Sequence, residues 1–299
     1  MGKELSDSFP VARETFQEAD EALAFPLSKL CFEGPEDELR LTTNTQPAIL
    51  TASIAALRVY RKEIGGEPEI AAGHSLGEYS ALVAAGVIDF ADAVRAVRER
   101  GRLMQEAVPA GQGAMAALIG LELSQVREIC QEVTRDGKLA VPANLNAPGQ
   151  IVIAGHASPV RRALEIAKER GASMSVELKV SAPFHCPLMQ PARDGMESVL
   201  RALKVGEFKF GVIANVTAEV NRDPARVVPS LLEQITSPVR WEESMGVVDR
   251  CGITDAIEFG CGRVLMGMMR RTYRAIRVRP LEDLASLKAI SQPATAAKT

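Results

Sequence analysis

The sequence predicts an α/β fold in which a small subdomain is inserted into a larger one. Two observations support this prediction. A strand, a glycine-rich turn and a helix follow one another over residues 69–85, which is the pattern of an α/β layer. Between residues 115 and 180 the elements alternate as β-α-β-β-α-β, which is the ferredoxin-like order.

In the larger part, apolar residues at three- and four-residue spacing predict a helix over residues 47–64, which Gly65 and Gly66 end. A short apolar strand over 69–72 then leads into the glycine-rich turn. The other elements predicted here are helices over 78–85, 91–104 and 229–235, strands over 208–216 and 254–259, and a helix from Arg263 onward.

In the smaller part, we expect strands over 115–119, 139–144, 150–154 and 174–180, with helices over 124–133 and 158–170. Ser124 and Ser158 are the predicted N-caps of these helices, because a serine hydroxyl can accept a bond from a free N–H of the first turn.

These elements divide the chain into three parts. A discontinuous large subdomain takes residues 1–112 and 183–290, and a small subdomain takes residues 113–182. The tail, residues 291–299, is mostly Ala, Thr and Pro without periodicity, and we expect it to be frayed.

Composition excludes several classes of function. The 299 residues carry a net charge of −3, which gives no general reason to expect nucleic-acid binding. The five cysteines are scattered and odd in number, which argues against a disulfide framework or a zinc site and for a reducing compartment. We expect a cytoplasmic protein, because no apolar stretch reaches the roughly 20 residues of a membrane span and the N-terminus lacks a signal peptide.

The candidate nucleophile is Ser75, in Gly73-His74-Ser75-Leu76-Gly77. Gly-x-Ser-x-Gly between a strand and a helix forces a sharp turn that lifts the hydroxyl beside the first free N–H groups of the helix. Those groups, the Leu76 N–H among them, can stabilise the oxyanion formed when an acyl carbonyl is attacked. The five-residue pattern also occurs as a plain tight turn, and the strand-turn-helix context favours the functional interpretation.

A serine nucleophile needs a base, and the chain has three histidines. His74 adjoins Ser75, where neighbouring side chains usually diverge, and His156 follows a strand of the small subdomain. His185 lies in a stiff segment, Pro183-Phe184-His185-Cys186-Pro187, where the chain leaves the small subdomain. His185 is therefore the candidate base, and a histidine merely packed between subdomains is the alternative.

Arg100 is the candidate for an anion site. It falls at the edge of the apolar stripe of its helix, whereas Arg95, Arg98 and Arg102 fall largely off that stripe. A buried guanidinium keeps its charge and needs an anion. That anion is either an Asp or Glu elsewhere in the chain or a substrate carboxylate held by two parallel hydrogen bonds.

The segment Gly73 to Ser80, followed by Ala85-Gly86, resembles the signature of malonyl-CoA:acyl carrier protein transacylases. The similarity covers residues 1 to about 270 and is far more specific than Gly-x-Ser-x-Gly alone. The other matching segments, in the expected order, are Thr45-Gln46-Pro47-Ala48, 98–105, Asn146-Ala147-Pro148-Gly149-Gln150, 182–186, Ser237-Pro238-Val239-Arg240-Trp241 and the glycine turn near Gly260.

The resemblance implies an α/β-hydrolase-like large subdomain with a parallel sheet and a ferredoxin-like small one. It implies a ping-pong reaction in which Ser75 takes the malonyl group from malonyl-CoA and passes it to the phosphopantetheine thiol of acyl carrier protein. The CoA thioester is a substrate, and no bound cofactor or metal is implied.

The resemblance also implies roles for single residues. His185 matches the general base, and a main-chain carbonyl that corresponds to Gln234 steadies it. Arg100 matches the residue that binds the malonyl carboxylate. Phe184 resembles the malonyl-selective form of its motif, where a bulky ring crowds an α-methyl branch.

Two departures from the family pattern stand out. A Gly-Gln-Gly-Ser-Gln turn after a first strand, whose glutamine helps to form the oxyanion hole, has no counterpart here, so we expect weak transfer and self-association from the chain as given. Cys261 stands where the family often has proline between two glycines, and we expect this to be tolerated.

Three alternatives remain open from the sequence. A serine esterase or thioesterase would use the same turn, but a neutral-ester hydrolase has no use for a buried Arg100. A trans-acting acyltransferase of polyketide synthesis would differ from one of fatty-acid synthesis only in its carrier protein. A truncated paralogue would bind carrier protein with little turnover.

Overall fold

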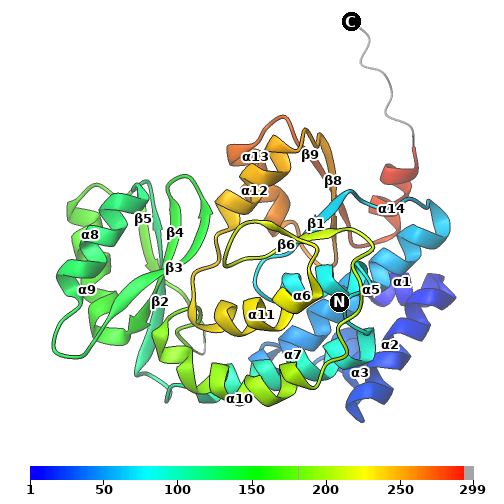
Figure 1. The fold of residues 1–299 in the computed structure, drawn as a ribbon, viewed down its shortest axis with the longest axis horizontal. Helices are drawn as coiled ribbons and strands as arrows, with labels where there is room; N and C mark the ends of the chain where they lie inside the picture. Colours follow the sequence, from blue (N-terminus) through cyan, green and yellow to red (C-terminus); the bar gives the residue numbers. More distant parts are fainter. Residues whose placement is uncertain (181, 293–299) are drawn as a thin grey trace, which may run out of the picture.

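The computed structural model describes residues 1–180 and 182–292 and has a mixed α/β fold, which confirms the predicted class at that level (Figure 1). A four-stranded sheet with two helices forms one end of the molecule. The larger part contains two short sheets and the remaining helices. Of the tail predicted over residues 291–299, the part from 293 onward lies outside the described residues. Its first residue, Ser291, is the last residue of a helix.

The sheet at the small end has the strand order β3-β4-β2-β5, and all of its neighbours are antiparallel. One face lies under α8 and α9, where Val126, Ile129, Val160 and Ala163 pack on the strands. The opposite face packs against Cys186 and thus against the segment that holds His185. Its elements are β2 (Gly113–Ile119), α8 (Leu123–Val133), β3 (Ala140–Ala147), β4 (Gln150–His156), α9 (Ala157–Glu169) and β5 (Met174–Glu177).

Both serine N-caps predicted for this part are wrong. Each helix begins one residue before the serine, so the serine lies inside the first turn. Glu122 is the N-cap of α8 and forms a capping box with Gln125, while His156 precedes α9.

The larger part is built on short parallel strand pairs. β1 (Ile70–Ala72) runs parallel to β6 (Gly211–Ile213), which pairs with the antiparallel β7 (Val220–Asn221). β8 (Asp255–Phe259) runs parallel to β9 (Arg277–Leu281). The helices that pack around these strands are α5 (Thr42–Glu63), α6 (Leu76–Ala84), α7 (Phe90–Glu106), α10 (Gln190–Arg201), α11 (Val227–Thr236), α12 (Trp241–Arg250), α13 (Val264–Thr272) and α14 (Leu284–Ser291).

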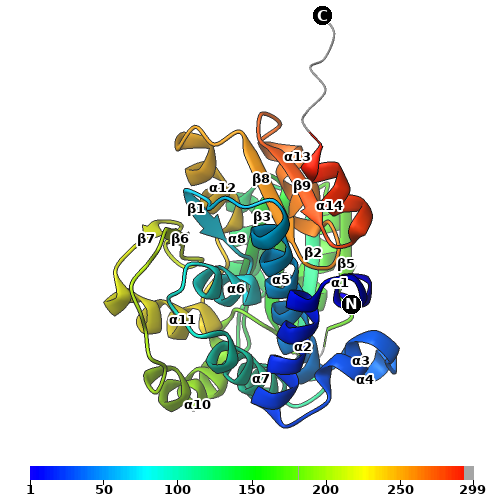
Figure 2. The ribbon, with the colours of Figure 1, turned by 90° about the vertical axis from the view of Figure 1, so that its right-hand side faces the viewer.

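The start of α5 differs from the prediction. The helix begins at Thr42 rather than at Pro47, so Pro47 lies inside it, although proline most often occupies the first turn. The N-terminal helices, which the periodicity did not predict, pack on α5, mainly through α2 (Figure 2). They are α1 (Lys3–Ser8), α2 (Pro10–Leu23), α3 (Leu27–Glu33) and α4 (Glu36–Leu39).

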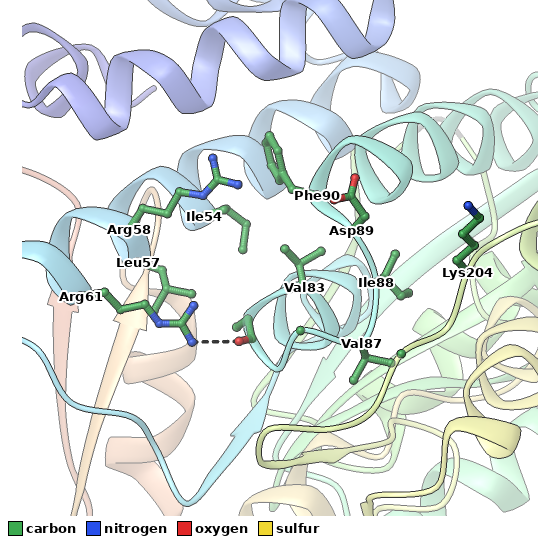
Figure 3. A pocket seen from close by; sticks show the side chains of 13 residues that line it. Ile54, Leu57, Arg58, Arg61, Val83, Val87, Ile88, Asp89, Phe90 and Lys204 are labelled. Carbon is green, nitrogen blue, oxygen red and sulfur yellow. Dashed lines mark hydrogen bonds between the residues drawn. The ribbon is translucent and has the colours of Figure 1, made fainter.

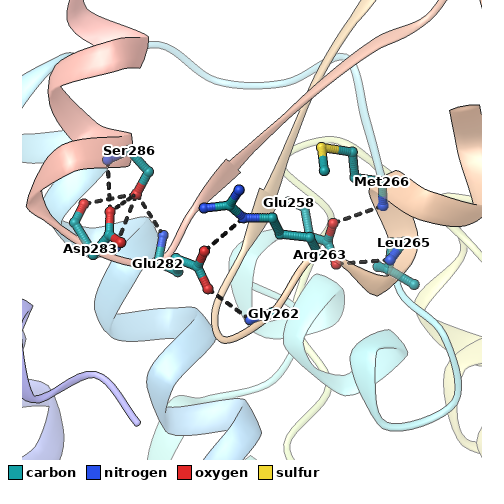
Figure 4. Close-up of polar contacts among 8 residues, drawn as sticks. All are labelled: Glu258, Gly262, Arg263, Leu265, Met266, Glu282, Asp283 and Ser286. Carbon is teal, nitrogen blue, oxygen red and sulfur yellow. Dashed lines mark hydrogen bonds and ion pairs between the residues drawn. The ribbon is translucent and has the colours of Figure 1, made fainter.

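Carboxylates fix the glycine turn after β8 (Figure 4). Glu258 accepts hydrogen bonds from the N–H groups of Leu265 (2.9 Å) and Met266 (2.8 Å), which stabilises the start of α13. Glu282 accepts from the Gly262 N–H at 3.0 Å and closes the turn that contains Cys261. Within the described residues, no helix has the length and apolar character that a membrane crossing requires.

Candidate active site

The turn at Ser75 is a strained strand-to-helix connection between β1 and α6. Ser75 has φ 53° and ψ −103°, which non-glycine residues rarely adopt. Gly73 must lack a side chain, because a Cβ there would lie 2.0 Å from the Gly77 carbonyl. The Asn215 side chain fixes the turn. Its Oδ1 accepts a hydrogen bond from the Ser75 N–H at 2.7 Å, and its Nδ2 donates one to the Gly73 carbonyl at 2.8 Å.

His185 contacts the serine directly. Its Nε2 lies 2.7 Å from Ser75 Oγ, and its Nδ1 lies 2.8 Å from the main-chain carbonyl of Gln234. The carbonyl can only accept, so Nδ1 carries the proton and Nε2 is free to accept one from Ser75. Burial, followed by the charge of Arg100, lowers the pKa of His185 to about 3, which keeps the imidazole neutral at pH 7.

Arg100 reaches the same hydroxyl from α7. It is 1% exposed, and one of its terminal nitrogens donates to Ser75 Oγ at 3.1 Å and to Gln234 Oε1 at 2.9 Å. The other donates to Gln46 Oε1 at 2.7 Å. Arg100 forms no direct ion pair with an Asp or Glu among the described residues. The alternative that Arg100 is one half of a simple structural ion pair therefore lacks a carboxylate in direct contact. Arg100 Nε is also buried, and it has no hydrogen-bond partner among the described residues.

A buried carboxylate lies behind these groups. Glu78, 3% exposed, accepts hydrogen bonds from the Asn215 N–H at 3.0 Å and from Gln234 Nε2 at 2.7 Å. Burial raises the pKa of Glu78 to about 7. Sequence reasoning missed the role of Glu78, although an acid inside the apolar run of α6 is a signal that could have singled it out.

The other two histidines do not contact the Ser75 hydroxyl but form hydrogen bonds elsewhere. His74 turns away from Ser75, and its Nε2 lies 2.8 Å from Asn146 Oδ1 of β3, which links the turn to the small end of the molecule. His156 accepts from the Leu139 N–H at 3.1 Å within the small end.

Leu76 and Phe184 complete the set of predicted residues. Leu76 is the first residue of α6, so its N–H has no acceptor within the helix. Phe184 is half-buried beside His185 and packs against both the main core and the face of the small sheet that lies opposite α8 and α9.

A surface cavity of about 380 Å³ lies at the opposite end of α6 and is separate from this site (Figure 3). Two of its cations are already paired, Arg58 with Glu18 and Arg61 with Glu67, each at 2.6–2.7 Å. Within the described ranges, no group of three or more His, Cys, Asp or Glu side chains is arranged to hold a metal ion.

The arrangement around Ser75 suits attack on an acyl carbonyl. A neutral imidazole can take the hydroxyl proton, and the start of α6 can stabilise the oxyanion. A strained serine between a strand and a helix, in contact with a buried histidine and a buried arginine, is the arrangement expected of an enzyme that transfers acyl groups.

Residues 1–291 match the acyl transferase domain, and the chain belongs to the acyl transferase family. It is 49% identical over 283 residues to the malonyl CoA-acyl carrier protein transacylase of Bacillus subtilis strain 168, with 95% of this chain and 89% of that protein covered. The corresponding protein of Escherichia coli K12 is 42% identical over 289 residues, with 97% and 93% covered.

Solved structures agree over nearly the whole chain. The malonyl CoA-acyl carrier protein transacylase from Coxiella burnetii superposes with a TM-score of 0.94 at 40% identity, covering 97% of this chain and 92% of that one. A malonyl-transacylase in complex with its type II PKS acyl-carrier protein also gives a TM-score of 0.94, at 43% identity, covering 97% and 93%.

Proposed function

We propose that this chain transfers a malonyl group from malonyl-CoA to the phosphopantetheine thiol of acyl carrier protein, for fatty-acid synthesis. The observation that carries the proposal is the buried Arg100 guanidinium, which donates to the nucleophile Ser75 Oγ at 3.1 Å. A cation without a direct carboxylate partner at this place suits an acyl group that bears its own carboxylate. The relatives that are malonyl CoA-acyl carrier protein transacylases support the same substrate.

The first half-reaction loads the serine. His185 Nε2 takes the Ser75 proton while Oγ attacks the thioester carbonyl, and the Leu76 N–H stabilises the oxyanion. Collapse expels CoA as thiolate, which takes the proton from His185 and leaves malonyl-Ser75. In the second half-reaction His185 accepts the proton of the carrier thiol, the thiolate attacks the ester, and the proton returns to Ser75 Oγ.

Three residues support this chemistry. The main-chain carbonyl of Gln234 holds the tautomer of His185, at 2.8 Å from Nδ1. Arg100 binds the malonyl carboxylate, for which its unpaired Nε supplies a donor. Phe184, half-buried beside His185, restricts an α-methyl branch and so favours malonyl over methylmalonyl.

We also propose the finer description of the fold. The small end, with six elements in the order β-α-β-β-α-β and the strand order β3-β4-β2-β5, fits a ferredoxin-like subdomain. The strained serine between the parallel strand β1 and α6 fits an α/β-hydrolase-like large subdomain. The reaction requires no bound cofactor, and five unpaired cysteines fit a reducing, cytoplasmic setting.

A carrier protein of polyketide synthesis is the second candidate. It is favoured by one observation, the structural similarity to the malonyl-transacylase bound to its type II PKS acyl-carrier protein. Comparing transfer to a fatty-acid and to a polyketide carrier protein decides between the two.

The proposed function is tested by incubating the protein briefly with malonyl-CoA and measuring its intact mass. We expect one malonyl adduct, mapped to Ser75 and absent from Ser75→Ala, which disappears on addition of carrier protein as malonyl carrier protein forms. Release of free malonate without transfer would indicate a thioesterase and would overturn the proposal.

A further inference from the structure

The side chain of Gln234 has contacts that its main-chain carbonyl does not explain. It is fully buried, and its Oε1 accepts from Arg100 at 2.9 Å. Its Nε2 donates to Glu78 Oε2 at 2.7 Å and to the Ser75 carbonyl at 3.0 Å. One amide therefore lies between a buried cation and a buried carboxylate.

This arrangement differs from an ordinary buried salt bridge. Arg100 and Glu78 are 1% and 3% exposed, and no direct ion pair between them occurs in the part of the chain that the structure describes. A direct pair would occupy the guanidinium with a resident carboxylate and would compete with a second one. The amide instead supplies each ion with a hydrogen bond and keeps them apart.

We infer that the side-chain amide of Gln234 is a positioning group. It holds Glu78, the counter-charge of Arg100 in the absence of substrate, one amide group away from the guanidinium. The guanidinium therefore stays available to a substrate carboxylate. The inference rests on the proposed function and concerns how this chain favours malonyl over uncharged acyl groups.

Arrival of the malonyl carboxylate has a consequence for Glu78. Two carboxylates then share one buried cation, so the charged form of Glu78 becomes less favourable and binding is linked to proton uptake. Since burial already raises the pKa of Glu78 to about 7, malonyl loading weakens as the pH rises through that value. Acetyl loading brings no second carboxylate and lacks this dependence.

Few other groups that face Glu78 titrate in this range. Arg100, from α7, remains charged. Tyr79, beside Glu78 in α6, has its pKa raised to about 12 by burial, and His185 has its pKa lowered to about 3. The remaining partners are neutral amides, Asn215 from the loop after β6 and Gln234 from α11.

The test measures single-turnover loading of Ser75 from malonyl-CoA and from acetyl-CoA, with KM and maximal rate for each, between about pH 6 and pH 9. Gln234→Met removes the amide and keeps the main-chain carbonyl, and Gln234→Glu places a carboxylate directly against Arg100. We expect both to raise the malonyl KM by ~10-fold or more, the size of a lost buried hydrogen bond, relative to any change for acetyl. Gln131→Met, on the exposed face of α8, is the matched control and keeps wild-type values.

Glu78→Gln removes the counter-charge and leaves the Gln234 amide unchanged. This variant should flatten the rise of the malonyl KM above about pH 7 that the wild type shows. Equal changes for malonyl and acetyl in both Gln234 variants, or a wild-type pH profile in Glu78→Gln, would overturn the inference while leaving malonyl transfer intact. A wild-type protein that never forms malonyl-Ser75 would overturn the proposed function as well. Thermal unfolding identifies any variant that fails to fold, and in that case the Glu78→Gln profile decides.

Discussion

Ser75 and His185 both hold backbone conformations that non-glycine residues rarely adopt, with φ values of 53° and 57°. Such residues cost about 1–3 kcal/mol each and persist where the surroundings fix them. Asn215 fixes the first, and the Gln234 carbonyl fixes the imidazole of the second. This backbone geometry places Ser75 Oγ 2.7 Å from His185 Nε2, the nitrogen proposed to accept its proton.

At this scale, the base is tested by His185→Ala. Its removal leaves Ser75 without a proton acceptor, so we expect transfer to fall by ~10²-fold or more. Malonyl transfer rates at saturating substrate provide the measurement, and His74→Ala, whose imidazole bonds Asn146 instead, provides the comparison. Near-normal transfer in His185→Ala alongside complete loss in His74→Ala would show that the base has been assigned wrongly.

The elements around Ser75 depend on close approach of two backbone segments. β1 can enter α6 through so sharp a turn only because Gly73 leaves room for the Gly77 carbonyl, 2.0 Å from where a Cβ would lie. Gly77 itself has open space around its Cβ position. The two glycines of the motif are therefore not equivalent.

At the scale of elements, Gly73→Ala should destabilise the protein by about 1–3 kcal/mol or prevent folding, because the new methyl group meets backbone that cannot move. Gly77→Ala should be neutral or stabilising by up to about 1 kcal/mol, because alanine is the better helix former. Urea unfolding of both variants provides the measurement. Equal losses of unfolding free energy would contradict this account of the turn.

Sequence periodicity predicted the strands and helices of the small end and the helix that carries Arg100. Ser75 came forward through its Gly-x-Ser-x-Gly motif, His185 through its stiff proline-flanked segment, and Arg100 through its place at the edge of an apolar stripe. Periodicity did not predict α1 to α4, α10, α12 or α14. Of these, α1, α3 and α4 are short, whereas α2 buries Ala12, Phe16 and Ala19 and α10 buries Ala192, Met196 and Leu200, which is a helical spacing that the sequence already contains. The cap at Ser124 was predicted wrongly because a capping box at Glu122 and Gln125 starts α8 earlier. The cap at Ser158 was wrong because α9 begins at Ala157, after His156, without a side-chain cap. The Glu78–Gln234–Arg100 contacts join residues 156 and 134 positions apart, which no local pattern reveals.

Over the whole molecule, buried ionisable groups act on stability in opposite directions. The pKa values of His185 and His74 are lowered by burial, so below pH 6.5 the unfolded chain binds protons that the folded chain does not, and stability falls as the pH drops. Glu78, with its pKa raised to about 7, contributes stability at low pH that is lost as the pH rises from 4.5 through 7.

We therefore expect His185→Gln to lose less unfolding free energy than the wild type on acidification from about pH 6.5 to pH 5. The difference should reach up to about 1.4 kcal/mol per pH unit, the value of one proton. Urea unfolding at several pH values measures both slopes. Parallel curves for the variant and the wild type would show that His185 does not resist protonation in the folded state.

The most direct test of malonyl recognition by the folded chain compares Ser75 loading from malonyl-CoA and acetyl-CoA in Arg100→Ala. Removing one side of a desolvated charge pair costs ~2–5 kcal/mol, so we expect malonyl loading to fall far more than acetyl loading and the preference to invert. Arg102→Ala, an exposed arginine on the same helix whose ion pairs lie at the surface, should keep the wild-type preference. Equal losses of malonyl and acetyl loading in Arg100→Ala would contradict a carboxylate-binding role and leave Arg100 as a structural residue.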